Sequence, residues 1–309
     1  VRCRRGTLKV MPISILQTDE WGRFKEQFGW KASRIGGVLV LERSLPLGQR
    51  FLYAPEPSEA ELTADALDAL VHHAWERRAM VLKIEPLVPR PARSFEEHLV
   101  RHGFAPSFET LQPQWRQWVL LEPPLEQILA EMKPKGRYNI AVARRADVMV
   151  RELDDVEHFS ALAKNTAQRQ GFSTRSTDYF KKLCTLPSVT LLGAWHQKDL
   201  LAAFIVSFKP PYALYLYGAS SAIKRETMAP YRLHWNVIEG AKAAQCTTYD
   251  LLAISPPNHP THRFANLTRF KQQFGGQPVE LVGAWDLVMR KSTYKAFRLL
   301  EKLRRPQVE

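Results

Sequence analysis

One lysine stands among aromatic residues near the end of the chain. Phe270 precedes Lys271, and Phe274-Gly275-Gly276 follows it. An ammonium group in apolar surroundings sheds solvation and can then stabilise an anion or a developing oxyanion. Lys271 is therefore the leading candidate for a catalytic group.

A compact basic run precedes the middle of the chain. Lys133-Pro134-Lys135-Gly136-Arg137-Tyr138-Asn139 opens a predicted helix. The first backbone N–H groups of a helix attract anions, and neighbouring Lys and Arg side chains strengthen that attraction. This run makes Arg137 a candidate substrate ligand.

Two further groups of side chains fit the same kind of site. Arg169 and Arg175 lie close together, and Tyr179 follows Arg175 at the four-residue spacing that shares a helix face. Tyr215 and Tyr217 end a predicted strand, from which a functional tyrosine would project at the sheet edge. Tyrosines on strands more often belong to a hydrophobic core. The evidence for a binding site is therefore the order of these tyrosines and the basic residues along the chain.

Other kinds of chemistry lack the residues that they need. The chain has no Walker loop, no GxGxxG after a strand, no GxSxG elbow and no cysteine in a recognisable nucleophile context. His72 and His73 point in different directions on a helix, and His259 and His262 lack a further ligand at suitable spacing. We therefore expect no covalent nucleophile, no metal site and no cofactor.

The elements that would position these residues form two α/β halves. In the first, apolar runs predict strands over 38–42, 51–54 and 81–84, with a helix over 21–25 and another opened by a capping box at Ser58 and Glu61. The second predicts helices over 155–170, 177–185 and 231–244, and strands over 189–195, 200–208, 212–217 and 248–252. Each half therefore predicts a mixed sheet covered by helices.

The remaining segments are predicted from composition. A short strand is expected over 13–16, a linker rich in Pro and Trp over 112–122, and a basic helix over 292–305. Residues 1–10 are expected to be an extension ahead of Met11-Pro12.

Composition limits the class of protein. The 309 residues suggest about two domains, and 45% hydrophobic content excludes a largely disordered chain. Lys and Arg outnumber Asp and Glu by 44 to 31, and this net charge of +13 fits a polyanionic partner. No apolar stretch approaches the ~20 residues of a membrane span, no signal peptide is recognisable, and three scattered cysteines indicate a reducing compartment.

Several tags along nearly the whole chain resemble the FemABX family of peptidoglycan bridge-forming peptidyltransferases. In order, they are Trp21-Gly22-Arg23-Phe24-Lys25, Lys83-Ile84-Glu85-Pro86, the run from Met132 to Ile140, Arg169-Gln170-Gly171-Phe172, Tyr179-Phe180, Tyr217-Gly218-Ala219-Ser220, Tyr249-Asp250-Leu251 and Phe270-Lys271-Gln272-Gln273-Phe274-Gly275-Gly276. Single short tags occur by chance, whereas the ordered series points to the family.

The resemblance implies an α/β fold of two GNAT-like domains. It places the first over residues 1–112, with 284–309 packing back onto it, and the second over 113–283. The implied activity is transfer of an amino acid from aminoacyl-tRNA to an amine of a peptidoglycan stem peptide. No long heptad insert is present, which resembles the compact members that act on UDP-MurNAc-pentapeptide; a lipid-linked precursor remains the alternative. The implied location is the cytoplasm, with peripheral contact at the inner membrane face left open.

The resemblance also assigns residues. Arg175, Tyr179 and Tyr217 match positions that grip the nucleotide-sugar phosphates and muropeptide, and either Arg23 or Lys25 matches a further grip. Lys271 matches the lysine associated with the tRNA end and catalysis. The chain departs from the family where Leu251-Leu252-Ala253 replaces a glycine-containing turn, and at Tyr53-Ala54-Pro55-Glu56-Pro57.

Two other functions compete with this hypothesis. A GNAT-type N-acyltransferase would use acyl-CoA, but its pyrophosphate loop, Arg/Gln-x-x-Gly-x-Gly/Ala, is not found in the sequence. A non-catalytic module that binds RNA or an envelope precursor would explain the charge alone. The ordered presence of Arg175, Tyr179, Tyr217 and Lys271 argues against that module.

Overall fold

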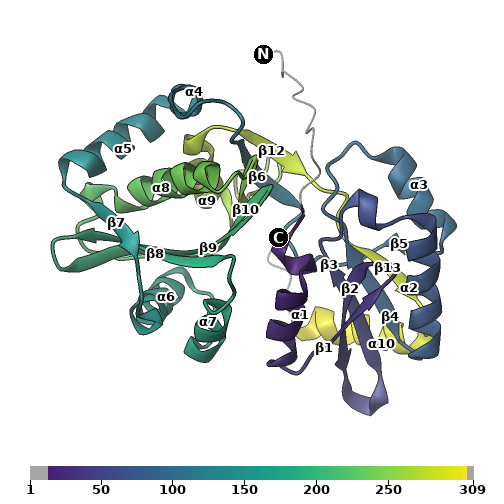
Figure 1. Ribbon diagram of the computed structural model, residues 1–309. Helices are drawn as coiled ribbons and strands as arrows, with labels where there is room; N and C mark the ends of the chain where they lie inside the picture. The colour runs from purple at the N-terminus through teal and green to yellow at the C-terminus, as the bar shows by residue number, and fades with distance from the viewer. Residues whose placement is uncertain (1–12, 305–309) are drawn as a thin grey trace. The chain divides into compact units, whose positions relative to one another are not determined.

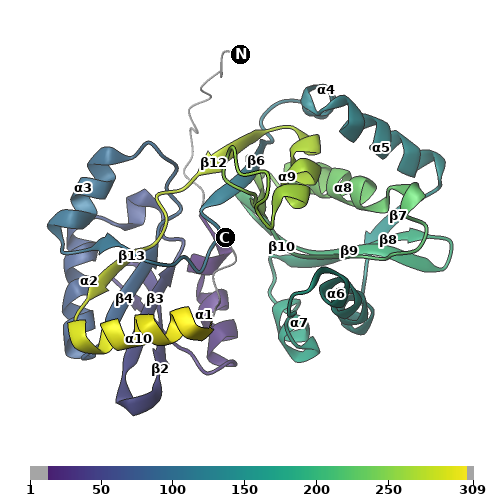
Figure 2. The same cartoon turned by 180° about the vertical axis from the view of Figure 1, so that it is seen from behind.

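The chain folds into two units, seen from opposite sides in Figures 1 and 2. The computed structural model describes the backbone of residues 13–304 and the side chains of residues 13–300. The first unit holds the described residues up to Gln112 and those from Leu281 onward, and the second holds Pro113–Glu280. The extension expected over residues 1–10 lies outside the described residues.

A six-stranded mixed sheet forms the first unit. Its strands, in spatial order, are β1 (Lys31–Ile35), β2 (Val38–Ser44), β3 (Arg50–Pro55), β4 (Val81–Glu85), β13 (Trp285–Val288) and β5 (Ala105–Pro106). β3 and β4 are parallel and the other neighbours antiparallel. A strand from the end of the chain thus lies between β4 and β5.

Alternation along these strands divides the helices of the first unit between two faces. Val38, Val40, Trp285 and Leu287 share a core with α2 (Ala64–Glu76) and α3 (Arg93–Arg101). The opposite face meets α1 (Asp19–Glu26), where Gly22 approaches Leu39, and α10 (Lys291–Arg304). In Figure 2, α10 crosses in front of the sheet.

The second unit contains a seven-stranded mixed sheet. Its order is β12 (Gln277–Glu280), β6 (Trp115–Leu120), β11 (Thr248–Ala253), β10 (Tyr212–Ser220), β9 (Asp199–Lys209), β8 (Val189–His196) and β7 (Met149–Glu152). β10 and β11 are its parallel neighbours, and they pair only from Tyr212↔Thr248 to Leu214↔Asp250. Beyond those three positions both strands continue without pairing to each other, so they diverge.

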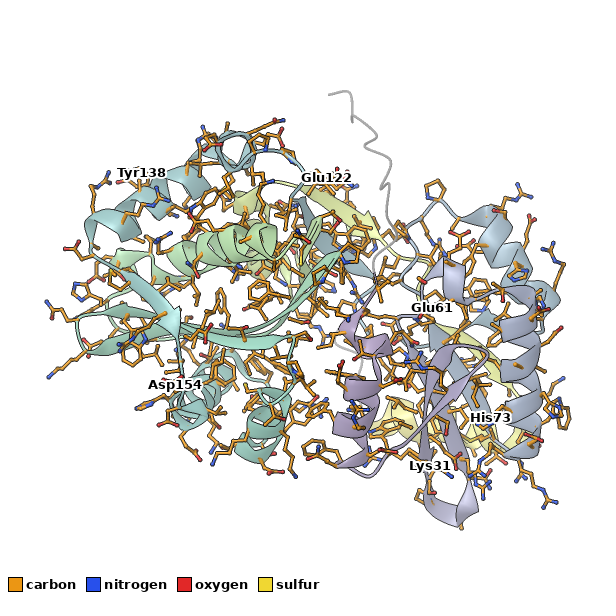
Figure 3. The ribbon with its side chains drawn as sticks, in the orientation of Figure 1. Lys31, Glu61, His73, Glu122, Tyr138 and Asp154 are labelled. Carbon is orange, nitrogen blue, oxygen red and sulfur yellow. The ribbon has the colours of Figure 1, made fainter. Side chains whose placement is uncertain are left out.

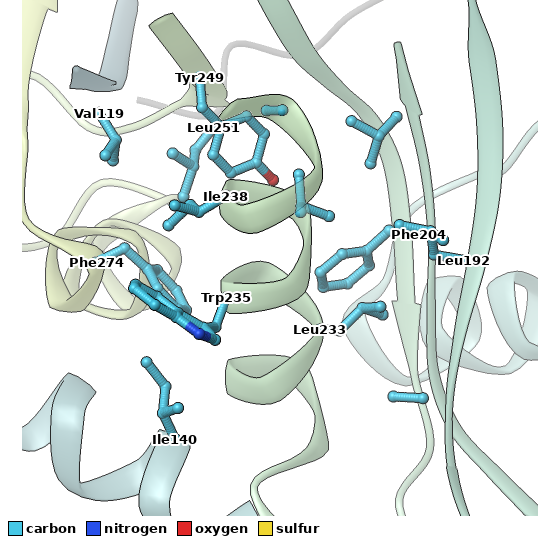
Figure 4. Packing of buried hydrophobic residues seen from close by; sticks show 14 of the residues in the cluster. Val119, Ile140, Leu192, Phe204, Leu233, Trp235, Ile238, Tyr249, Leu251 and Phe274 are labelled. Atoms are coloured by element: carbon cyan, nitrogen blue, oxygen red, sulfur yellow. The ribbon is translucent and has the colours of Figure 1, made fainter. Parts of the chain in front are cut away.

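Helices cover both faces of this second sheet (Figure 1). α6 (Val156–Gln170) and α7 (Thr177–Leu183) lie on one face, and α4 (Leu125–Glu131), α5 (Pro134–Arg145), α8 (Ala229–Ala243) and α9 (Ala265–Lys271) lie on the other. The apolar side of α8 fills the core on its face, with Leu233 beside Phe204 and Ile238 beside Leu251 (Figure 4). No described helix is both long and apolar enough to cross a membrane.

Local capping explains two differences from the sequence-based elements. Residues 13–16, expected as a strand, enter the 3-10 helix Ile15–Gln17, because the Ser14 side chain accepts a hydrogen bond from the Leu16 N–H. The capping box of Ser58 and Glu61 is present, but it closes a separate 3-10 turn, and α2 begins after a new N-cap at Thr63.

The predicted linker over residues 112–122 is wrong. Trp115–Leu120 forms β6, which lies inside the second sheet between β12 and β11. Its prolines flank the strand rather than interrupt it, and both of its neighbours lie more than a hundred residues further along the chain. Composition alone therefore could not predict this strand, because both of its partner strands are distant in the sequence.

Candidate active site

Lys271 is buried at the end of α9, against the place where β10 and β11 part. Its Nζ donates a hydrogen bond to the carbonyl oxygen of Ala253, the last residue of β11, at 2.7 Å. The same nitrogen lies 5.8 Å from the centre of the Tyr215 ring on β10. The lysine thus stands between the separated strands, and its burial holds the group in one position.

The surroundings of Lys271 change its acid–base behaviour. Burial lowers the pKa of the Lys271 amine to about 7, with the Asp250 carboxylate opposing that fall and the Arg116 guanidinium adding to it. Near neutral pH the amine therefore exists in both protonation states. As an ammonium it is a weakly solvated donor, which suits a developing oxyanion.

A buried ion pair supports the strand that carries the Lys271 acceptor. Arg116 on β6 and Asp250 on β11 are fully buried, with 2.9 Å between guanidinium and carboxylate. The same carboxylate accepts hydrogen bonds from the Tyr212 hydroxyl and, at 2.6 Å, from the Leu252 N–H. Three strands therefore converge on one carboxylate.

This carboxylate also explains how the chain departs from the family turn. Leu252 has φ +58°, in the region that favours glycine. Because Asp250 accepts the Leu252 N–H, it holds leucine in that strained conformation. The turn after the Tyr-Asp pair therefore keeps a glycine-like backbone without a glycine.

His234 on α8 was not predicted as a site residue and lies in the same cluster. Its Nδ1 is 2.9 Å from the Tyr249 hydroxyl, and its ring centre is 5.1 Å from that of Tyr215. Among the described residues, Nε2 has no hydrogen-bond partner. Burial, and then the charge of Lys271, hold the pKa of His234 well below its ordinary value, so the imidazole is neutral.

Tyr179, Tyr217 and Arg175 form a second group. The hydroxyls of Tyr217 and Tyr179 are 3.4 Å apart, and the Arg175 guanidinium carbon lies 5.3 Å from the centre of the Tyr179 ring. Burial raises the pKa of the Tyr179 phenol, so it remains a hydrogen-bond donor. This group faces α7, whereas Tyr215 packs in the core on the α8 side.

The other candidate arginines of the second unit contact backbone carbonyls. Arg169 donates to the Ser220 carbonyl at 2.9 Å. Arg137 donates to the carbonyls of Ala130, at 3.0 Å, and Met132. Arg137 therefore caps the end of α4, and Arg169 fixes the end of β10 near the Tyr217 group.

Arg23 and Lys25 belong to the first unit. Arg23 is exposed on α1, and the Lys25 ammonium lies 5.7 Å from the ring centre of Trp30 and 5.9 Å from that of Trp21. Both remain candidate ligands.

The chemistry of the described residues does not include a metal centre. Between residues 13 and 300, no group of three or more His, Cys, Asp or Glu side chains is placed to hold a metal ion. The polar groups of the site are instead an ammonium, a guanidinium and phenols. These suit anions and oxyanions.

Sequence reasoning missed the support for Lys271. In the sequence, Tyr249 and Asp250 stand out only as part of a short motif, and no pattern predicts a role for Arg116 or His234. Arg116 lies in the segment that composition predicts as a linker, and a linker residue is expected to be exposed. Its burial could therefore not be predicted. The available signal was an arginine that directly follows Trp115 and lies two residues before Trp118.

Fold and site together define an α/β protein of two mixed-sheet units with a buried lysine where two parallel strands part. The FemAB family model matches residues 94–186 and 194–302, more than half of the chain. The chain therefore belongs to the FemAB family.

Named relatives agree with that membership. A lipid II:glycine glycyltransferase of Staphylococcus aureus (strain USA300) is 21% identical over 378 aligned positions, covering 91% of this chain and 89% of that protein. The crystal structure of FemX matches with a TM-score of 0.82 at 19% identity, covering 92% of this chain and 94% of that one. L-PGS from Bacillus licheniformis matches with a TM-score of 0.56 at 12% identity, over 88% of each chain.

These comparisons confirm two predictions. The FemX fold confirms the expected α/β class, with two mixed sheets covered by helices. The family and the glycyltransferase relatives confirm the predicted enzyme class, an aminoacyltransferase.

Proposed function

We propose that this enzyme transfers an amino acid from an aminoacyl-tRNA to the side-chain amine of a peptidoglycan stem peptide. The observation that carries the proposal is the buried Lys271 ammonium between the separated ends of β10 and β11. An aminoacyl ester is already activated, so the reaction needs no protein nucleophile. The described site accordingly offers donors and no activated thiol or hydroxyl.

The proposed reaction balances without a cofactor. The neutral acceptor amine attacks the ester carbonyl, a C–N bond forms and the ester C–O bond breaks. The proton lost by the amine ends on the departing ribose oxygen of the tRNA. Lys271 donates to the tetrahedral oxyanion, and the rest of the site contributes positioning.

We propose that the Tyr179, Tyr217 and Arg175 group binds the pyrophosphate-bearing end of the acceptor. Guanidinium and phenol donors suit phosphate oxygens, and Arg175 is exposed beside a buried tyrosine. Arg169 fixes the end of β10 beside this group, whereas Arg137 caps α4 and Tyr215 packs near Lys271 on the other face of the sheet. We also propose either Arg23 or Lys25, both on α1, as a substrate ligand.

The acceptor has two possible carriers with the same pyrophosphate chemistry. The glycyltransferase relative is named for lipid II, and its alignment spans 378 positions against the 309 residues of this chain. Because the sequence has no long heptad insert and in this resembles the compact members of the family, we propose UDP-MurNAc-pentapeptide as its acceptor, with lipid II as the alternative. The proposed substrates place the enzyme in the cytoplasm, at the inner membrane face if the lipid-linked precursor is used.

The test offers the protein both acceptors and weighs the products. We would incubate it with a mixture of charged tRNAs and either UDP-MurNAc-pentapeptide or lipid II, alongside a Lys271→Ala variant and an exposed Lys164→Ala control. A mass gain of one amino acid that Lys271→Ala loses supports the proposal. Acylation only with acyl-CoA, or binding of both substrates without product, would overturn it.

A further inference from the structure

Helix α5 carries an exposed stripe that the proposed reaction has not used. Lys135, Tyr138, Val142 and Arg145 follow one another at spacings of three, four and three residues, which place them along one helix face. Lys135 and Arg145 are exposed, and Tyr138 is 63% exposed. We call these four residues the α5 stripe. Figure 3 shows Tyr138 on the side of α5 that faces away from α8.

The opposite face of α5 explains why the stripe points outward. Ile140 and Ala143 pack in the core, and a Cβ at Gly136 would lie 2.2 Å from the Gln273 carbonyl oxygen. The helix therefore cannot rotate about its axis without losing that core or creating this clash. The orientation of the stripe is fixed by packing.

The charge of the stripe is not neutralised locally. α5 contains no acidic residue, and neither Lys135 nor Arg145 lies within ion-pair distance of a carboxylate in residues 13–300. Arg144 differs, because it faces Glu239 at 3.8 Å. The Arg145 guanidinium carbon lies 6.0 Å from the Tyr138 ring centre, so a flat aromatic face stands next to free positive charge.

The N-terminal end of α5 lies beside the residues that follow Lys271, the proposed catalytic lysine. The Lys133 N–H donates to the Gln273 carbonyl at 3.2 Å, and the Lys133 ammonium lies 3.4 Å from the Gln272 side-chain oxygen. α5 then runs away from that contact for twelve residues, about 18 Å at 1.5 Å per residue. A strand of RNA whose end is held at Lys271 would have this surface beside its next nucleotides.

We propose that the α5 stripe docks the acceptor arm of the tRNA, with Lys135 and Arg145 on backbone phosphates and Tyr138 stacked on a base or ribose. The inference rests on the proposed function, and it assigns the RNA to a surface outside the catalytic cluster. Basic side chains supply most of the affinity for a nucleic acid, and an exposed aromatic ring adds stacking that ignores sequence.

An anionic membrane is the competing partner, and the stripe fits it less well. Membrane-surface helices carry a broad apolar face beside their basic residues. The exposed side of α5 instead has one half-buried valine and a single phenol, while its apolar face is occupied by the core of the second unit.

Binding of a defined RNA tests the proposal. The probe is a fluorescent hairpin with the sequence of a tRNA acceptor arm, titrated by anisotropy between 50 and 300 mM KCl, about the range over which phosphate contacts respond to salt. The variants are Lys135→Glu with Arg145→Glu, and Tyr138→Ala. Lys164→Glu, exposed on α6 at the opposite sheet face, is the matched control.

The proposal predicts a specific pattern. The double charge reversal raises the Kd at least about tenfold and makes it less dependent on salt, by about 0.7–0.9 per lost phosphate contact in the logarithmic slope. Tyr138→Ala raises the Kd about threefold or more and leaves that slope unchanged. In transfer assays the KM for charged tRNA rises, while the KM for the precursor stays constant.

Other results overturn the proposal in distinguishable ways. Equal RNA binding by all variants, with transfer intact, removes the α5 stripe and leaves the proposed function standing. Loss of binding to phosphatidylglycerol vesicles without loss of RNA binding assigns the stripe to a membrane instead. No RNA binding and no transfer by the unaltered protein would overturn the proposed function together with the inference.

Discussion

Tyr215 and Tyr217 lie two residues apart on one strand, yet on opposite faces of its sheet. The register of β10 against β9 shifts between them, so that Tyr215 pairs with Val206 and Tyr217 with Ile205. Tyr215 consequently joins His234 on the α8 side, and Tyr217 joins Tyr179 on the α7 side. One irregularity thus divides the proposed site into a lysine cluster and a tyrosine–arginine cluster.

That division predicts separate kinetic effects. Arg175→Ala should raise the KM for the pyrophosphate-bearing acceptor about tenfold, equivalent to about 1.4 kcal/mol, and change kcat less than about twofold. Lys181→Ala on α7, the helix that follows Arg175, is the control, and Lys181 is paired with Glu157 at 2.6 Å. Steady-state kinetics with each substrate varied in turn would measure both constants. A rise confined to the KM for charged tRNA would assign Arg175 to the other substrate.

The pKa of Lys271 predicts a pH profile. Raising the pH makes more neutral acceptor amine, whose ordinary pKa is about 10.4, but above about 7 it removes the Lys271 ammonium. The two effects cancel, so kcat/KM should rise to about pH 7 and then level. Arginine stays charged, so Lys271→Arg should continue to rise, about tenfold per pH unit. A folded but inactive Lys271→Arg protein would contradict the donor role and favour proton acceptance.

His234 should make the second unit sensitive to acid. Its pKa is depressed in the folded chain, mainly by burial, so below about pH 6.5 the unfolded chain binds a proton that the folded chain refuses. The free energy of unfolding therefore falls as the pH drops below about 6.5. His234→Phe should reduce that fall by about 1.4 kcal/mol per pH unit. Urea titrations between pH 5 and 7 would show it, with exposed His259→Gln keeping the original slope.

The buried ion pair should be costly to break from one side. Asp250→Asn leaves the buried Arg116 charge without its carboxylate, and we expect a loss of about 3–5 kcal/mol in the free energy of unfolding. Asp178→Asn, which breaks an exposed pair with Lys182, should cost less than about 1 kcal/mol. Replacing Arg116 and Asp250 together by Met and Leu should recover part of the loss; if it does not, packing rather than charge explains the cost.

Two glycines with similar φ angles should differ in their tolerance of alanine. Gly276 has φ +69°, and its added Cβ would lie 2.0 Å from the Trp118 carbonyl oxygen. Gly171 has φ +71° with nothing within 4 Å of that position. Gly171→Ala should therefore cost about 1–2 kcal/mol from the backbone alone, and Gly276→Ala about 3 kcal/mol or more. If urea unfolding shows equal losses in the free energy of unfolding for the two variants, the backbone at the sheet edge shifts to accommodate the added Cβ at Gly276.

Local patterns were enough for much of the fold. α6 and α8 carry apolar residues at helical spacing over fifteen residues each, and β8 and β9 are apolar runs around a polar turn. Such elements are visible because their own residues specify them. The mixed sheets and the family could therefore be predicted before any contact was known.

The supporting groups of the site depend on contacts that sequence does not display. Arg116 pairs with Asp250, 134 residues away, and the bulge at Tyr215 arises only from pairing with β9. Lys271 itself was predicted from its aromatic neighbours, but its depressed pKa follows from burial that only the folded chain provides. Candidate residues could thus be predicted, whereas their division between two faces could not.

The position of β13 has a consequence for the order in which the chain is made. Trp285–Val288 fill the space between β4 and β5, although the whole second unit is translated after those two strands and before β13. On the ribosome, β4 therefore emerges with one edge unpaired. The hydrophobic core of the first unit lacks Trp285 and Leu287 until the end of the chain is translated. The second unit, continuous from Pro113 to Glu280, has all its strands before then. The unit that is begun first is thus the last to be completed.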